Sequence, residues 1–194
     1  MRSATISRKT KETDIIVKLG LDGPGRVKVK TGIGFFDHML DLVAKHAALA
    51  LRIEAAGDLE VDFHHTVEDV GICLGQAIKQ ALRDKAGIRR YGWAIVPMDE
   101  ALVLAAVDVS GRAHLSYELE LRRRRVQEFE AELIEEFFRA LTGAAGINLH
   151  LRQLAGRNTH HLIEAAFKAF ARALREAVEA DPRSGGVPST KGKL

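Results

Sequence analysis

The sequence predicts an α+β fold made of two similar halves in tandem, with sheets packed against a layer of helices. A motif supports the repeat: His64-His65-Thr66-Val67-Glu68 returns as His160-His161-Leu162-Ile163-Glu164, at a constant offset of 96 residues (160 − 64 = 164 − 68 = 96). Each copy also opens an apolar pattern of helical period. The predicted elements run β-β-β-α-β-α over about 3–90 and again over about 91–181, which is typical of a tandem repeat.

The first half is expected to contain three strands, a helix, a fourth strand and a long helix. Alternating apolar residues predict strands at 3–9 and 14–19, and Val27 and Val29 alternate with basic residues in a third. A helix from about 35 to 46 and a strand near 48–55 follow. The long helix runs over about 63–85, and Asp62 lies before it, where a short acceptor side chain can take the free N–H groups.

The second half repeats this order. Strands are predicted at 94–98, 101–109 and 114–121, a helix over about 131–141, and a strand at 147–151. The last helix follows the N-cap candidate Asn158 and runs to about 180, and residues 182–194 form a tail. The arginine run at 122–125 is interpreted as a solvated strand end rather than an arm for nucleic acid.

Composition limits the class of protein. The 194 residues are 46% hydrophobic and 28% charged, as in a globular protein, and we expect a single domain over 1–194. A net charge of +3 does not suggest a dedicated nucleic-acid protein. The lone cysteine, Cys73, allows no internal disulfide. No stretch resembles a signal peptide or the roughly 20 apolar residues of a membrane span, so a cytoplasmic location without membrane contact is expected.

The repeated motif predicts a metal centre. Residues four apart lie on one face of a helix, so His64 with Glu68, and His160 with Glu164, can each bind one ion. Adjacent histidines point about 100° apart, so the second histidine of each pair should face a different ion. The alternative is two pairs of structural or surface histidines. Repetition at a fixed offset, with a glutamate in register, favours two metal sites, each fed by both copies.

Several segments together resemble the imidazoleglycerol-phosphate dehydratase family, from about Arg8 to Gly192. The segments that carry the resemblance are Gly34-Phe35-Phe36-Asp37-His38-Met39-Leu40, His64-His65-Thr66-Val67-Glu68-Asp69, Pro97-Met98-Asp99-Glu100-Ala101-Leu102, Asp108-Val109-Ser110-Gly111-Arg112, Asn158-Thr159-His160-His161 with Glu164-Ala165, Phe167-Lys168-Ala169, and Val187-Pro188-Ser189-Thr190-Lys191-Gly192.

The resemblance implies a fold, a reaction and an assembly. The fold is that of ribosomal protein S5 domain 2. The reaction removes water from D-erythro-imidazole-glycerol phosphate to give imidazole-acetol phosphate in histidine biosynthesis. It depends on manganese, with two Mn²⁺ ions at each active site between subunits of a homo-oligomeric shell of roughly two dozen copies (a 24-mer).

The resemblance also implies roles for individual residues. One ion would be held by His38, His64, Glu68 and His161. The other would be held by His65, His160, Glu164 and Glu136, the last at a position where many family members have a histidine. The phosphate pocket would contain Arg90, Arg112, Lys168, Ser189 and Lys191. Proton transfer and substrate contact fall to Glu12, which matches a family glutamate reaching from a neighbouring subunit, and proton transfer also to Glu164.

Two other functions fit part of the pattern. A dinuclear metallohydrolase acting on a small phosphorylated substrate would also gather histidines and glutamates around two ions. A storage or assembly shell would use the same ligands only to join subunits. The combination of a phosphate-binding set with a metal-binding set argues against the storage shell. Asp99 is expected to orient a metal ligand through a hydrogen bond.

Overall fold

A computed structural model describes residues 1–23, 25–183, 185–192 and 194 of the chain. In these residues it contains two four-stranded sheets, a two-stranded hairpin and four α-helices, which confirms the predicted α+β class. The elements of the first half are β1 (Ser3–Lys9), β2 (Thr13–Gly20), β3 (Val27–Lys30), α1 (Gly34–His46), β4 (Ala50–Gly57) and α2 (His64–Leu82).

The second half repeats this succession with one addition. Its elements are β5 (Tyr91–Met98), β6 (Ala101–Asp108), β7 (His114–Glu118), β8 (Arg125–Val126), β9 (Phe129–Glu130), α3 (Leu133–Ala145), β10 (Asn148–Ala155) and α4 (Thr159–Val178). The β8–β9 hairpin was not predicted. The arginine run leads into it and is exposed, as expected, and Arg125 pairs with Glu130 across the hairpin.

The two sheets have the same topology. The strand order is β1-β2-β4-β3 in one and β5-β6-β10-β7 in the other. In each sheet the first three strands pair antiparallel, and the third pairs parallel with the edge strand, β4 with β3 and β10 with β7. This shared order is the structural counterpart of the repeated sequence motif.

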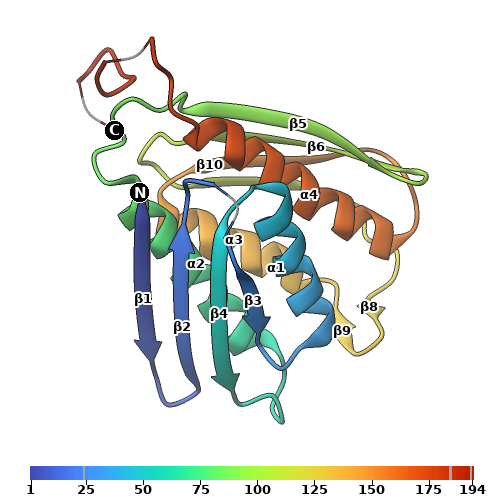
Figure 1. Ribbon diagram of the computed structural model, residues 1–194. Coiled ribbons are helices and arrows are strands. Elements are labelled where there is room, and N and C mark those ends of the chain that lie inside the picture. Colours follow the sequence, from blue (N-terminus) through green and yellow to red (C-terminus); the bar gives the residue numbers. More distant parts are fainter. Residues whose placement is uncertain (24, 184, 193) are drawn as a thin grey trace.

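The helices lie between the two sheets (Figure 1). Helix α2 packs against β1 and β2 of its own sheet and against α3, whereas α4 packs against β5 and β6 and against α1. The apolar faces of all four helices and the inner faces of both sheets form one hydrophobic core. Gly71 and Gly75 bring α2 close to α3, since a Cβ atom at either would lie under 3.0 Å from a backbone oxygen of α3.

The starts of the two long helices differ. Asn158 is the N-cap of α4, as predicted, and its side chain accepts hydrogen bonds from the backbone N–H groups of His160 and His161. Asp62 is not the N-cap of α2, so that prediction was wrong: Phe63 holds the position, with helical backbone angles. The Asp62 carboxylate still accepts a hydrogen bond from His64 N at 2.8 Å, because it lies two residues before that free N–H group.

Candidate active site

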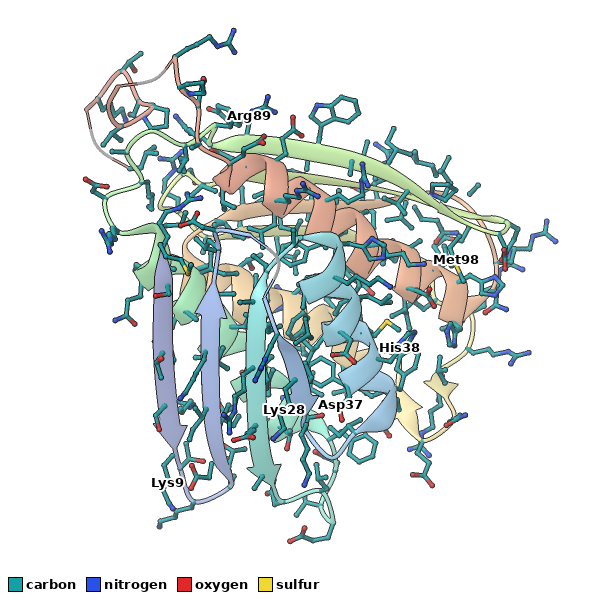
Figure 2. All side chains as sticks on the ribbon, viewed as in Figure 1. Lys9, Lys28, Asp37, His38, Arg89 and Met98 are labelled. Carbon is teal, nitrogen blue, oxygen red and sulfur yellow. The ribbon has the colours of Figure 1, made fainter. Side chains whose placement is uncertain are left out.

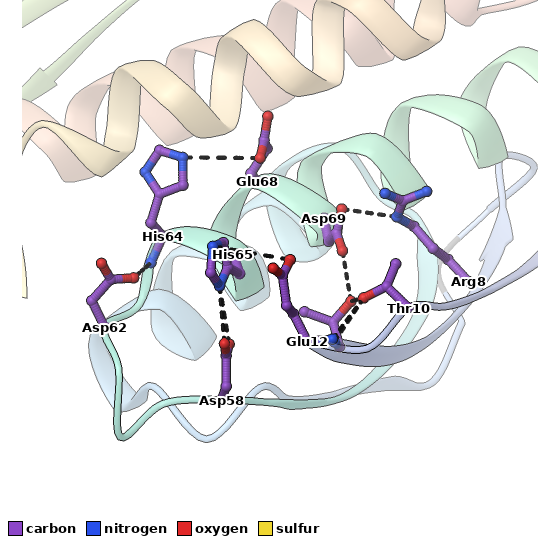
Figure 3. A network of polar contacts seen from close by, with 10 residues as sticks. Arg8, Thr10, Glu12, Asp58, Asp62, His64, His65, Glu68 and Asp69 are labelled. Atoms are coloured by element: carbon purple, nitrogen blue, oxygen red, sulfur yellow. Dashed lines mark hydrogen bonds and ion pairs between the residues drawn. The ribbon is translucent and has the colours of Figure 1, made fainter.

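The first copy of the motif lies in a group of polar side chains that we call the first-half cluster: Glu12, Asp58, His64, His65 and Glu68 (Figure 3). His64 Nε2 lies 3.9 Å from Glu68 Oε2, one helical turn on. His65 Nδ1 lies 3.0 Å from Asp58 Oδ2, and its Nε2 lies 4.0 Å from Glu12 Oε2. The hydrogen bond with Asp58 raises the pKa of His65 against an opposing effect of desolvation, and the Glu12 carboxylate adds to the rise.

A buried carboxylate ties this cluster to the first sheet. Asp69, on the second turn of α2, accepts a hydrogen bond from Arg8 Nε at 2.8 Å and another from Thr13 Oγ1 at 2.6 Å. These bonds connect the start of α2 to the ends of β1 and β2, which flank the turn that carries Glu12 (Figure 3). The turn is therefore held beside the histidine pair by the fold itself.

The second copy of the motif lies in a larger group, the second-half cluster, whose members come from α1, the β5–β6 turn and α4. They are His38, Asp99, Glu100, His160, His161, Glu164 and Lys168.

Glu164 is the centre of the second-half cluster. Its Oε2 lies 3.3 Å from His160 Nε2 and 3.8 Å from His38 Nε2, and its Oε1 lies 2.6 Å from Lys168 Nζ. Burial alone would raise the pKa of Glu164, but the bond to Lys168, followed by that to His160, brings this pKa below its ordinary value. The carboxylate is therefore held ionised next to two imidazole rings.

His161 is held by the turn between β5 and β6. Its Nδ1 lies 2.7 Å from Glu100 Oε2, and its Nε2 lies 3.6 Å from Asp99 Oδ2. Glu100 Oε1 also accepts hydrogen bonds from the backbone N–H groups of Arg157 and Asn158, at 3.1 and 2.8 Å. The bond to His161 and these backbone bonds lower the pKa of Glu100 to about 2.

Sequence reasoning missed Asp58 and Glu100, which make the shortest polar contacts of His65 and His161. Asp99 was expected to orient a metal ligand through a hydrogen bond. It lies in the correct turn, but the carboxylate that accepts the hydrogen bond of His161 belongs to its neighbour Glu100. A signal for Glu100 was present, because Glu12 and Glu100 each stand directly before the second strand of their half, β2 and β6.

Within one chain, the predicted metal ligands are grouped differently from the two sets that the family resemblance implied. His38 lies beside His160 and Glu164, which were expected to bind the other ion, because α1 packs against α4. Glu136 is half-buried on α3, and its side chain has no hydrogen-bond or ion-pair partner within the described part of the chain. Its neighbour Glu135 pairs with Arg139.

The predicted phosphate residues lie mainly at the opposite end of α4. Arg90 donates from Nε to Asp108 Oδ1 at 2.8 Å and from Nη1 to the Pro188 carbonyl at 2.9 Å, so it holds the tail. Its backbone N–H bonds to Ala177 O, 17 residues and about 25 Å along α4 from His160.

Ser189 and Lys191 lie in the same tail, where Ser189 Oγ accepts a hydrogen bond from Lys191 N. Arg112 is exposed just after β6. Figure 2 shows this separation: Arg89 lies at one end of α4, and His38 and Met98 lie toward the other. Lys168 alone among the five predicted phosphate residues lies in a histidine cluster.

The donor types fit manganese, since imidazole nitrogens and carboxylate oxygens are ligands of Mn²⁺, Zn²⁺ and Fe²⁺ alike. Across residues 1–23, 25–183, 185–192 and 194, no three or more His, Cys, Asp or Glu side chains are arranged as a complete ion site. The chain thus contributes suitable ligands in two separate clusters. None of the helices in these same residues is long and apolar enough to cross a membrane.

Comparisons with known proteins agree with the fold and the motifs. The family model for imidazoleglycerol-phosphate dehydratase matches residues 31–174. The imidazoleglycerol-phosphate dehydratase of Desulforamulus reducens is 62% identical over 193 residues, covering 100% of this chain and 98% of the relative. That of Moorella thermoacetica is 59% identical over 193 residues, with the same two coverages.

Two solved structures of imidazoleglycerol-phosphate dehydratase share the fold. The Staphylococcus aureus structure superimposes with a TM-score of 0.83 at 41% identity, over 92% of this chain and 99% of that one. The Pyrococcus furiosus structure, a complex with (S)-C348, gives 0.85 at 40% identity, over 97% and 100%. With the two full-length relatives and the matching family model, they show that this chain belongs to the imidazoleglycerol-phosphate dehydratase family of lyases in histidine biosynthesis.

Proposed function

We propose that the chain converts D-erythro-imidazole-glycerol phosphate to imidazole-acetol phosphate with two manganese ions per active site. The observation that carries the proposal is the environment of Glu164, an ionised carboxylate that contacts His38, His160 and Lys168 in a chain of this family. A carboxylate, two imidazoles and a lysine in contact support the proposal, because these groups could take up a proton, bind a metal ion and bind a phosphate.

The ions would be held by side chains from both clusters. The proposed ligands are His38, His64, His65, Glu68, Glu136, His160, His161 and Glu164. Manganese bound there would polarise the imidazole ring of the substrate and so assist the departure of the hydroxyl group from the carbon attached to that ring.

Carboxylates of the chain would carry the protons. The hydroxyl on the carbon attached to the ring takes up a proton and leaves as water, and the C–H bond of the next carbon breaks and passes its proton to a carboxylate. The resulting enol then takes up a proton on the ring-attached carbon to give the ketone. Glu12 and Glu164 are the proposed carriers. Glu12 lies in an exposed turn 4.0 Å from His65, and Glu164 is held ionised. Lys168, whose Nζ bonds to Glu164, would bind the phosphate of the substrate close to this carboxylate.

The complete site would be shared between copies of the chain. Arg90 and the tail lie about 25 Å along α4 from His160, and the substrate, an imidazole ring on a three-carbon phosphate, is too short to span that distance. This separation supports a homo-oligomer in which the tail end of one copy meets the histidine end of another. Such a biosynthetic assembly would work in the cytoplasm, with the phosphorylated imidazole as its small-molecule partner.

Substrate specificity tests the proposal against a dinuclear metallohydrolase. Manganese-loaded protein is incubated with imidazole-glycerol phosphate and, separately, with generic phosphomonoesters. A dehydratase forms imidazole-acetol phosphate and releases no inorganic phosphate. Phosphate release from the generic esters without formation of the ketone would instead establish the hydrolase, and an absence of either product would indicate a shell that only stores metal.

A further inference from the structure

Glu12 and Glu100 occupy equivalent places in the two halves. Glu12 directly precedes Thr13 at the start of β2, and Glu100 directly precedes Ala101 at the start of β6, at an offset of 88 residues (100 − 12 = 101 − 13 = 88). Both carboxylates approach the second histidine of their own half, but at different nitrogens. Glu12 lies 4.0 Å from His65 Nε2, whereas Glu100 lies 2.7 Å from His161 Nδ1.

Both second histidines nevertheless have a carboxylate at Nδ1. In the first half this partner is Asp58, which follows β4, and in the second half it is Glu100. An ionised carboxylate can only accept hydrogen bonds, so the ring must donate from Nδ1. In a neutral imidazole the remaining lone pair is then on Nε2, the nitrogen free to bind a metal.

Glu100 does more than bind a ring. Its Oε1 accepts the backbone N–H groups of Arg157 and Asn158, while its Oε2 accepts from His161. Asn158 in turn caps α4 by accepting the N–H groups of His160 and His161. One carboxylate therefore fixes the approach to α4 and the orientation of the His161 ring at the same time.

We propose that Glu100 is a positioning residue, which locks His161 in the tautomer protonated at Nδ1 and so presents its Nε2 as a metal ligand. The metal-binding consequence rests on the proposed function, but the tautomer itself does not. Glu100 touches neither substrate nor ion in this assignment. It acts through His161, as its equivalent Glu12 does not, because Asp58 already occupies Nδ1 of His65.

The substitution Glu100→Gln tests this role, because it should move the proton of the His161 ring from Nδ1 to Nε2 only if Glu100 sets the tautomer. A glutamine amide has one accepting atom and one donating group. If its oxygen keeps the N–H groups of Arg157 and Asn158, its NH₂ faces Nδ1 of His161 and requires that nitrogen to accept. The ring should then become protonated at Nε2, the wrong tautomer for a ligand that binds through Nε2.

The test is solid-state ¹⁵N NMR of metal-free, histidine-labelled protein at alkaline pH, where the rings are neutral. The His161 signals are assigned as those that disappear in His161→Gln. We expect protonation at Nδ1 in the wild-type protein and at Nε2 in Glu100→Gln. A wild-type ring protonated at Nε2, or a ring that is unchanged in Glu100→Gln, would overturn the proposal. The wild-type measurement stands even where a variant folds poorly.

Asp99→Asn is the matched control, since Asp99 lies in the same turn but 3.6 Å from the other ring nitrogen. It should leave His161 protonated at Nδ1, and His65 should stay so in every variant that folds correctly. Manganese titration is the second measurement, and Glu100→Gln should weaken one ion by about 10- to 100-fold. If the wild-type protein bound no manganese, the proposed function would fail, and the tautomer would still decide the assignment of Glu100.

Discussion

The starts of α2 and α4 carry the same motif in different surroundings. The side chain of Glu68 is 46% exposed and its one close polar neighbour among the described residues is His64, at 3.9 Å. The side chain of Glu164 is 10% exposed and contacts His38, His160 and Lys168. The position equivalent to Lys168 in the first half is Ile72 (168 − 96 = 72), which has no charge.

The two copies of the motif therefore suit different roles. Glu68 is exposed and has a single ion-pair contact, with His64, which would suit a group that acts only as a metal ligand. Glu164 is held in place and ionised in the metal-free chain, because the positive charge of Lys168, one helical turn further on, stabilises its carboxylate. The repeated sequence supplies the same histidines and glutamate in both halves, and neighbours on α1 and α4 give the second copy different surroundings.

The two glutamates should differ most in how their replacement by glutamine changes kcat. Glu164→Gln should lower kcat by about 10²- to 10⁴-fold even at saturating manganese, because it removes a proposed proton carrier. Glu68→Gln should mainly weaken metal binding and recover activity when manganese is in excess. Steady-state kinetics across a manganese titration measure both. Full recovery of Glu164→Gln by excess manganese would make the two glutamates equivalent and refute the contrast.

Glu136 extends the comparison to α3. If it is a metal ligand, Glu136→Ala should weaken one ion per subunit by about 100-fold and spare the other, whereas Glu136→His should keep both. The carboxylate should also favour manganese over zinc more than the histidine variant does. Glu135→Ala is the control, because Glu135 is engaged with Arg139. A metal titration of Glu136→Ala with two unaltered sites would exclude the ligand role.

The tail tests whether the two ends of α4 have separate tasks. Deleting residues 186–194 removes Ser189 and Lys191 and the contact of Arg90 with Pro188, and should raise KM about 10- to 100-fold. Manganese content should stay at the wild-type value, because none of the proposed metal ligands lies within the deleted residues. Wild-type kinetics in the truncated protein would mean that the tail takes no part in binding phosphate.

The smallest expected effect concerns stability. Lys168→Met should destabilise the metal-free protein by about 1.5 kcal/mol at neutral pH, because it removes the charged partner of a largely buried carboxylate. The folded-state pKa of Glu164 is lowered, so this stabilisation is present above the unfolded-state pKa and is lost as the pH falls through the folded-state pKa.

Denaturant unfolding at matched subunit concentrations should therefore show the wild-type and Lys168→Met curves converging in acid. Ile72→Met, at the equivalent position of α2, should show no such pH dependence. A difference between wild type and Lys168→Met that persists unchanged at low pH would assign the effect to packing instead of the ion pair.

Much of this architecture could be predicted from periodicity, because long amphipathic helices and alternating strands leave strong local patterns. The β8–β9 hairpin could not, since strands of two residues carry no period. The hydrogen bonds of Asp58 and Glu100 depend on which turn of a sheet lies beside a helix start, and no spacing along the chain encodes that. The distance between His160 and Arg90 likewise follows from the direction of α4 across its sheet.

Metal content and activity measured on the same preparation test the central claim most directly. We expect two manganese ions per subunit in the active protein, loss of imidazole-acetol phosphate formation when both are removed by a chelator, and recovery when manganese is added back. Full turnover by protein verified to be free of metal would contradict it.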